Sequence, residues 1–171
     1  MVLGLSLQAF TVIHVLISLA GIACGSVVVY GFLTNQRLDR WTTAFLITTA
    51  LTCVTGFLFP FTTATPAIKL GIMEVVVLAI AWVTRYTLHL TWRKTYVIAA
   101  CAALYLNVFV LVVQGFEKVP MLKAIAPTQT EPPFAIAQIA VCLLFVVLTI
   151  FAAKKFRTEP TTAAKSKATA A

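Results

Sequence analysis

Five apolar stretches, separated by short polar connections, constrain the fold of this chain more than any other feature. They run approximately over residues 9–33, 41–61, 68–88, 95–115 and 134–153. An α-helix rises about 1.5 Å per residue, so about 20 apolar residues cross the ~30 Å hydrocarbon core of a bilayer. The sequence therefore predicts an all-α integral membrane bundle of five transmembrane helices within residues 1–153.

The charged residues are too few to give such a chain a water-soluble surface. Hydrophobic residues make up 61% of the 171 positions and charged residues only 11%, whereas charged residues are about a quarter of a soluble domain. The net charge is +8, but the basic residues do not form a stripe interleaved with aromatic side chains, as nucleic-acid binding requires. We therefore expect the lipid bilayer as the partner of this surface, and no nucleic acid.

The connections between the apolar stretches differ in how many Lys and Arg residues they carry. Three of the thirteen lie on one side, namely Lys69, Lys118 and Lys123. The other ten lie on the opposite side: Arg37, Arg40, Arg85, Arg93, Lys94, Lys154, Lys155, Arg157, Lys165 and Lys167. Basic connections stay in the cytoplasm, so we predict the N-terminus outside and the C-terminus inside. Residues 154–171 are expected to form a disordered basic cytoplasmic tail, because they are too poor in apolar residues to build a core.

Each predicted span carries one stripe of small or polar residues. In the first span, Gly21 and Gly25 form a GxxxG pair and share a helical face with His14. Helices in lipid associate through close packing and hydrogen bonds, because the lipid removes the hydrophobic drive between them. We expect these stripes to face inward in an antiparallel bundle.

Polar side chains from all five spans fall at a similar depth, about 8–10 Å below the outer surface for most of them. This polar layer comprises His14, Thr55, Glu74, Asn107, Gln114 and Gln138. Glu74 is the most informative member of this layer, because an acid inside a membrane is costly unless it is protonated, hydrogen-bonded or paired. His14 is the ionisable donor at the same depth, so we predict that His14 and Glu74 are close and coupled.

The same residues match no cofactor or catalytic motif. His14 lies in the outer half and His89 at the inner end, so one haem cannot be ligated by both. His14 and Glu74 supply two metal ligands where a site needs three or four. The cysteines occur singly, without a CxxC, and the chain has no nucleophile elbow or Gly-rich phosphate loop. We expect no metal, no cofactor and no enzymatic activity.

Two functions remain open from the residues alone. In the first, the chain is a non-enzymatic accessory or scaffold protein that packs in a larger membrane complex or a homo-oligomer, and the polar layer sets the register of the helices. In the alternative, the chain is a small binding or transport protein. The layer around Glu74 and His14 would then line a cavity for a quinone, a lipid headgroup or a proton.

Two segments resemble a known group of proteins. Residues 38–61, LDRWTTAFLITTALTCVTGFLFPF, and residues 105–134, YLNVFVLVVQGFEKVPMLKAIAPTQTEPPF, are similar to uncharacterised small multi-pass bacterial inner-membrane proteins. The resemblance covers most of the chain. It implies a location in the bacterial inner membrane, and it implies no activity, cofactor or catalytic residue.

The long connection between the fourth and fifth spans is predicted to contain a short helix, from about Lys118 to Ala126. Pro120 falls in its first turn, where proline is tolerated, and Pro127 ends it. Apolar residues recur at helical spacing along this segment. We expect the helix to lie on the outer surface and to have one apolar face.

Overall fold

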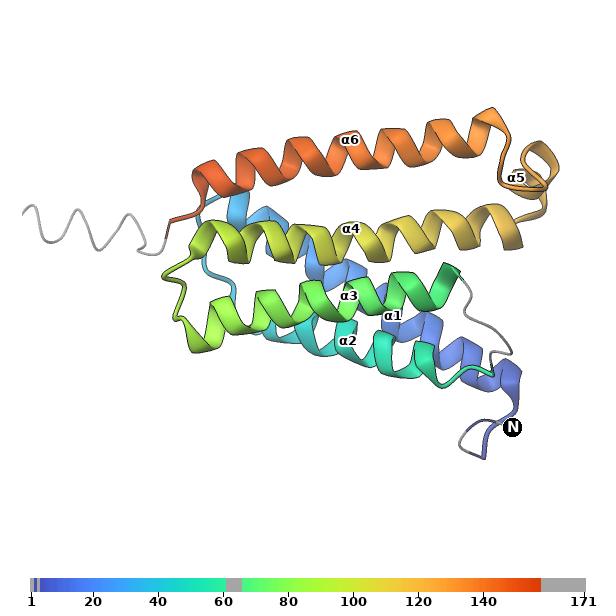
Figure 1. The fold of residues 1–171 in the computed structure, drawn as a ribbon, viewed down its shortest axis with the longest axis horizontal. Coiled ribbons are helices and arrows are strands. Elements are labelled where there is room, and N and C mark those ends of the chain that lie inside the picture. The colour runs from blue at the N-terminus through green and yellow to red at the C-terminus, as the bar shows by residue number, and fades with distance from the viewer. Residues whose placement is uncertain (1, 3, 61–65, 158–171) are drawn as a thin grey trace, which may run out of the picture.

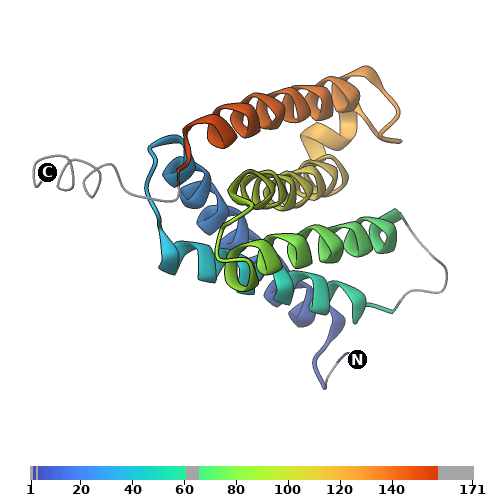
Figure 2. The same ribbon diagram turned by 60° about the vertical axis from the view of Figure 1, so that its left-hand side comes forward.

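The computed structural model describes residues 2, 4–60 and 66–157, which form helices and no strand (Figure 1). The helices are α1 (Leu7–Leu33), α2 (Asp39–Phe57), α3 (Pro66–Trp82), α4 (Arg93–Lys118), α5 (Pro120–Ile125) and α6 (Pro132–Lys155), and a π-helical turn, η1 (Val83–Thr87), continues α3. The five long helices lie alongside one another and alternate in direction, with α5 at one end (Figures 1 and 2). The predicted all-helical bundle is confirmed.

Four of the long helices are long and apolar enough to cross a membrane: Leu7–Leu33, Ala67–Thr87, Arg93–Lys118 and Pro132–Lys155. The fifth, α2, has 19 residues, but six of them are threonines and its first two are charged. These residues lower its hydropathy below that of its neighbours. The helix also ends at Phe57, four residues before the predicted end at residue 61, which lies outside the described residues.

Helix α4 occupies the middle of the bundle. It packs against α1, α3 and α6, and both views place it between α3 and α6 (Figures 1 and 2). Half of an apolar 18-residue stretch of α4 is buried inside the protein, compared with 6% of the equivalent stretch of α6. Helix α2, like α4, packs against both α1 and α3.

The close approach of α1 to its neighbours depends on its glycines. A Cβ atom added at Gly25 would lie 2.7 Å from Cδ1 of Leu104 and 2.8 Å from Cε2 of Phe45. At Gly21 it would lie 3.3 Å from the hydroxyl of Thr48. Both glycines are buried. The absence of a side chain at these two positions therefore lets α1 pack directly on α2 and α4.

One end of the bundle, here called the basic end, contains the connections 34–38 and 88–92 and the end of α6. Helix α6 extends to Lys155, two residues beyond the predicted end. Phe156 follows, is almost fully buried, and packs its ring edge-on against Phe32 with ring centroids 4.9 Å apart. The guanidinium of Arg93 donates to the carbonyl of Phe156. These contacts fix the end of α6 to α1 and α4. Of the predicted disordered tail, residues 158–171 lie outside the described residues.

The connection at the opposite end contains the predicted short helix. Helix α5 has Pro120 in its first turn and ends at Ile125, two residues before Pro127, so the predicted helix is confirmed. After it, Gln129 Nε2 donates to the carbonyl of Val113 at 3.0 Å. This hydrogen bond ties the second half of the connection back to α4.

Candidate functional site

The first contact of the polar layer joins α1 to α2. His14 Nδ1 and Thr55 Oγ1 are 2.7 Å apart, and the imidazole is half-buried. The ring of Phe59 lies edge-on against it, with ring centroids 5.3 Å apart. Thr55 lies two residues from the end of α2, so this contact closes one end of the α1–α2 pair.

The second contact joins α3 to α4 and contains the buried acid. Asn107 Nδ2 donates to Glu74 Oε1 at 3.2 Å, and the two residues are 9% and 7% exposed. The same amide also donates to the carbonyl of Ala103 at 3.1 Å. Asn107 therefore orients its amide through its own helix and presents a hydrogen to the carboxyl group of the neighbouring helix.

The third contact joins α6 to α4. Gln138 Nε2 donates to the carbonyl of Phe109 at 3.2 Å, whereas Gln138 Oε1 is buried with no hydrogen-bond partner among the described residues. Gln114, the remaining member of the predicted layer, is exposed on α4 close to Lys118 at the helix end. No hydrogen bond joins it to another described member of the layer.

His14 and Glu74, which were predicted to be close and coupled, each have a different hydrogen-bond partner. Among the described residues no hydrogen bond or ion pair joins these two side chains; His14 contacts Thr55 and Glu74 contacts Asn107. The main neighbours of α1 are α2, α4 and α6, whereas those of α3 among the long helices are α2 and α4. A similar depth along two helices does not make those helices neighbours.

The polar layer thus consists of three separate interhelical contacts rather than one connected network. No hydrogen bond between described residues links one contact to another. Within the described part of the chain, no three His, Cys, Asp or Glu side chains converge in a way that would hold a metal ion. Chemically, this arrangement can hold pairs of helices in register, and it offers one buried carboxyl group that can carry a proton.

The sequence analysis missed a second buried cluster, which lies at the basic end. Arg85 is 7% exposed, and its guanidinium donates to the carboxylate of Asp39 at the start of α2. It also donates to the hydroxyl of Tyr96 on α4 at 3.2 Å. The guanidinium carbon lies 5.2 Å from the ring centroid of Tyr96 and 5.6 Å from that of Tyr86, which are cation–π distances. One arginine thereby connects the end of α3 with α2 and α4.

The π-helical turn carries this arginine. In η1 the amide of Leu88 donates to the carbonyl of Val83 at 2.9 Å, one residue further back than in an α-helix, which widens the turn around Arg85. The sequence offered a signal, because Arg85 lies inside the predicted span 68–88, near its end. It was interpreted only as a loop charge that reports topology.

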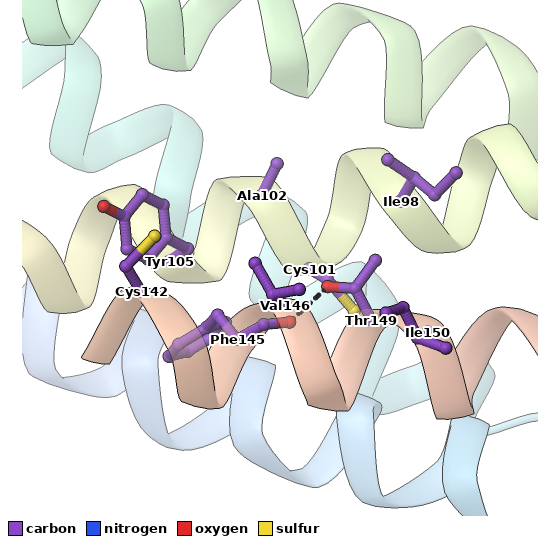
Figure 3. A pocket seen from close by; sticks show the side chains of 9 residues that line it. All are labelled: Ile98, Cys101, Ala102, Tyr105, Cys142, Phe145, Val146, Thr149 and Ile150. Carbon is purple, nitrogen blue, oxygen red and sulfur yellow. Dashed lines mark hydrogen bonds between the residues drawn. The ribbon is translucent and has the colours of Figure 1, made fainter. Parts of the chain in front are cut away.

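A further feature is an apolar groove of about 280 Å³ between α4 and α6 (Figure 3). Helix α4 contributes Ile98, Cys101, Ala102 and Tyr105 to its lining, and α6 contributes Cys142, Phe145, Val146, Thr149 and Ile150. The groove contains no member of the polar layer. It runs along the two helices, with Tyr105 and Cys142 at one end and Ile98 and Ile150 at the other (Figure 3).

The candidate site thus has three parts: the interhelical contacts, the Arg85 cluster and the groove. Comparison of the chain with protein-family models, with curated proteins and with solved structures found no match.

Proposed function

We propose that this chain is a non-enzymatic accessory or scaffold protein that packs in a larger complex, or as a homo-oligomer, in the bacterial inner membrane. The observation that carries the proposal is that the buried members of the polar layer are used in contacts between adjacent helices. His14 joins α1 to α2, Glu74 joins α3 to α4, and Gln138 joins α6 to α4. Such contacts fix helix register in lipid, which favours a structural role over a ligand cavity in this layer.

The apolar surface of α6 supports the same proposal. Large side chains on this helix are well exposed, among them Ile136, Ile139, Leu143 and Leu144 at 53–65%. Lipid covers such a face readily, and so does the transmembrane helix of another protein. Because α6 buries little of itself within the chain, it is the long helix with the most surface available for a partner.

We further propose that all five long helices cross the membrane. Helix α1 ends at the basic end, and α3 begins at the opposite end (Figure 1). If both of these helices span the bilayer, the chain between them must cross it too. The 19 residues of α2 reach about 28 Å as a helix, which is close to the hydrocarbon thickness. The positive-inside rule then places the basic end in the cytoplasm and the N-terminus outside.

Reporter fusions check this topology. We expect a cytoplasmic signal for fusions after Arg40, Lys94 and Lys155, and an external signal for fusions after Thr65 and Thr130. The physical reason is that Lys and Arg residues resist transfer across the membrane. The same signal after Arg40 and after Thr65 would show that α2 does not cross as proposed, and a cytoplasmic signal after Thr130 would contradict the orientation.

Purification from the native membrane tests the accessory role. The tagged full chain is extracted in a mild detergent, and the proteins that co-purify are identified by mass spectrometry. We expect a stable larger complex or a homo-oligomer. A variant with Leu143 and Leu144 both replaced by Asn is extracted in the same way. If the exposed face of α6 binds the partner, this variant should no longer co-purify with it. A monodisperse single copy carrying a bound small molecule contradicts the accessory role.

One observation favours a second candidate, a binding or transport function for a proton, a quinone head or a lipid headgroup. Glu74 is a buried acid in a membrane helix, its carboxyl group has one hydrogen-bond partner among the described side chains, and intramembrane acids are commonly functional. Vesicles containing the wild type or Glu74→Gln distinguish the candidates, since Gln keeps the size but carries no titrating proton. Faster decay of a pH gradient in the wild type alone supports transport; equal decay supports the structural role.

A further inference from the structure

The groove between α4 and α6 has the length of a lipid chain segment. It runs from Ile98 to Tyr105 along α4 and from Cys142 to Ile150 along α6. At 1.5 Å per residue these segments are about 11–12 Å long. One leaflet of the hydrocarbon core is about 15 Å thick, so the groove covers most of one leaflet.

The position of the groove along the helices identifies that leaflet. Ile98 lies five residues from the start of α4, and Ile150 lies five residues from the end of α6. Both helix ends are at the basic end of the bundle (Figure 1). The groove therefore begins about 8 Å from the basic end and continues toward the middle of the membrane. In the topology proposed above, this is the cytoplasmic leaflet.

Two lysines continue the lining of the groove toward the basic end. Lys94 is four residues before Ile98 on α4, and Lys154 is four residues after Ile150 on α6. Residues four apart are neighbours on the surface of a helix, so each lysine lies beside the outermost groove residue of its own helix, about 6 Å beyond the end of the groove. Both side chains are exposed, and neither forms an ion pair with a described residue.

The other charges at this end leave the two lysines available. Arg93 is held by the carbonyl of Phe156. Among the described residues at the basic end, Asp39 carries the side-chain carboxylate, and this carboxylate already binds Arg85. Lysine ammonium groups on flexible stems reach toward the headgroup region, where they attract phosphate.

We infer that this groove is a binding site for an anionic phospholipid of the cytoplasmic leaflet. One acyl chain lies in the groove between α4 and α6, and the phosphate lies between Lys94 and Lys154. The inference rests on the membrane orientation proposed above, but it does not depend on the accessory role. The lysines beyond one end of the groove match the charge of a phosphate, and the groove itself matches the length of an acyl chain in one leaflet. Both features favour a lipid over a second protein helix, which would not need the lysines.

A photo-crosslinking experiment tests the site. The full chain is reconstituted in phosphatidylcholine vesicles that contain a small fraction of phosphatidylglycerol with a diazirine in the acyl chain, and adducts are mapped by mass spectrometry. We expect adducts within residues 98–105 and 142–150, several-fold more than with the matching diazirine phosphatidylcholine. Replacing Lys94 and Lys154 by Gln should weaken capture of the anionic lipid by roughly 25-fold, since each basic residue contributes about a fivefold factor.

Matched variants separate the groove from the general lipid surface. Lys69→Gln with Lys123→Gln, at the opposite end, should leave the groove adducts unchanged. Ala102→Trp fills the groove and should remove its adducts with both lipids, while adducts at the lipid-exposed Ile72 of α3 persist. Equal capture of the two headgroups, or protein–protein crosslinks at groove residues in place of lipid adducts, overturns the inference. Loss of adducts at Ile72 as well contradicts the membrane location itself, which distinguishes the two failures.

Discussion

Replacing Asp39 by Asn is expected to lower the free energy of unfolding by about 2 kcal/mol. The substitution keeps the size of the side chain but removes the charge that balances the buried guanidinium of Arg85. Removing one partner of a fully buried ion pair costs about 3–5 kcal/mol. The effect should be smaller here, because the side chain of Asp39 is 63% exposed and because Tyr96 and Tyr86 still contact the guanidinium. Reversible unfolding in detergent micelles measures the change.

Two further variants show whether the loss arises from the stranded charge. Arg85→Met in the Asp39→Asn background should recover much of the stability, since a flexible apolar side chain replaces the unpaired cation. Arg37→Ala is the matched control: Arg37 also approaches Asp39, at 3.6 Å, but its side chain is 42% exposed, so we expect a change below about 0.5 kcal/mol. An Asp39→Asn variant as stable as the wild type contradicts a stabilising role for this cluster.

Replacing Gly25 by Ala is expected to destabilise the bundle by about 1–3 kcal/mol. In most helix interiors this substitution is favourable by up to about 1 kcal/mol. Here the new Cβ would lie under 3.0 Å from Leu104 on α4 and from the ring of Phe45 on α2. The aromatic ring is buried and cannot move aside easily, so α1 must shift away from both helices.

Gly115→Ala provides the control for this prediction. Gly115 is also helical, but its added Cβ would meet Leu122 Cδ1 at an ordinary 3.7 Å. We expect this variant to be neutral or slightly more stable than the wild type, through its higher helix propensity. Thermal unfolding of the two variants measures this difference in stability. A Gly25→Ala variant that gains as much stability as Gly115→Ala is incompatible with close packing of α1 at this position.

The helices of this fold could be predicted from the sequence because lipid imposes a simple rule of length and composition. Each apolar stretch became a long helix, and α5 follows from prolines that start and stop a turn. The ends of α2 were less predictable. Its threonines are compatible with a helix in lipid, but they reduce the difference in hydropathy between the span and its flanking connections. The end of the span is therefore hard to locate from the sequence, and the helix ends before Leu58.

The contacts of the candidate site could be predicted only in part. Depth can be read from the position of a residue within its stretch, and it correctly drew attention to Glu74 and Asn107. Which helices are neighbours cannot be read in this way: the hydrogen-bond partner of Glu74 is Asn107 on α4, whereas depth had suggested His14 on α1. Arg85 was missed for a different reason. A basic residue near a span end fits the topology signal whether it is exposed or buried, and burial depends on where Asp39 and Tyr96 lie in space.

The interhelical role of the polar layer is tested most directly by the free energy of unfolding of Glu74 and Asn107 variants. If the pair mainly holds α3 against α4, Glu74→Gln should stay within about 0.5 kcal/mol of the wild type, because an amide can still accept from Asn107. Glu74→Leu should lose about 1–2 kcal/mol. The cycle with Asn107→Leu should give a coupling energy of about 0.6–1.7 kcal/mol, the range of hydrogen bonds between membrane helices. A Glu74→Leu variant more stable than the wild type, with no coupling to Asn107, would contradict the structural role and indicate an acid retained for chemistry at the expense of stability.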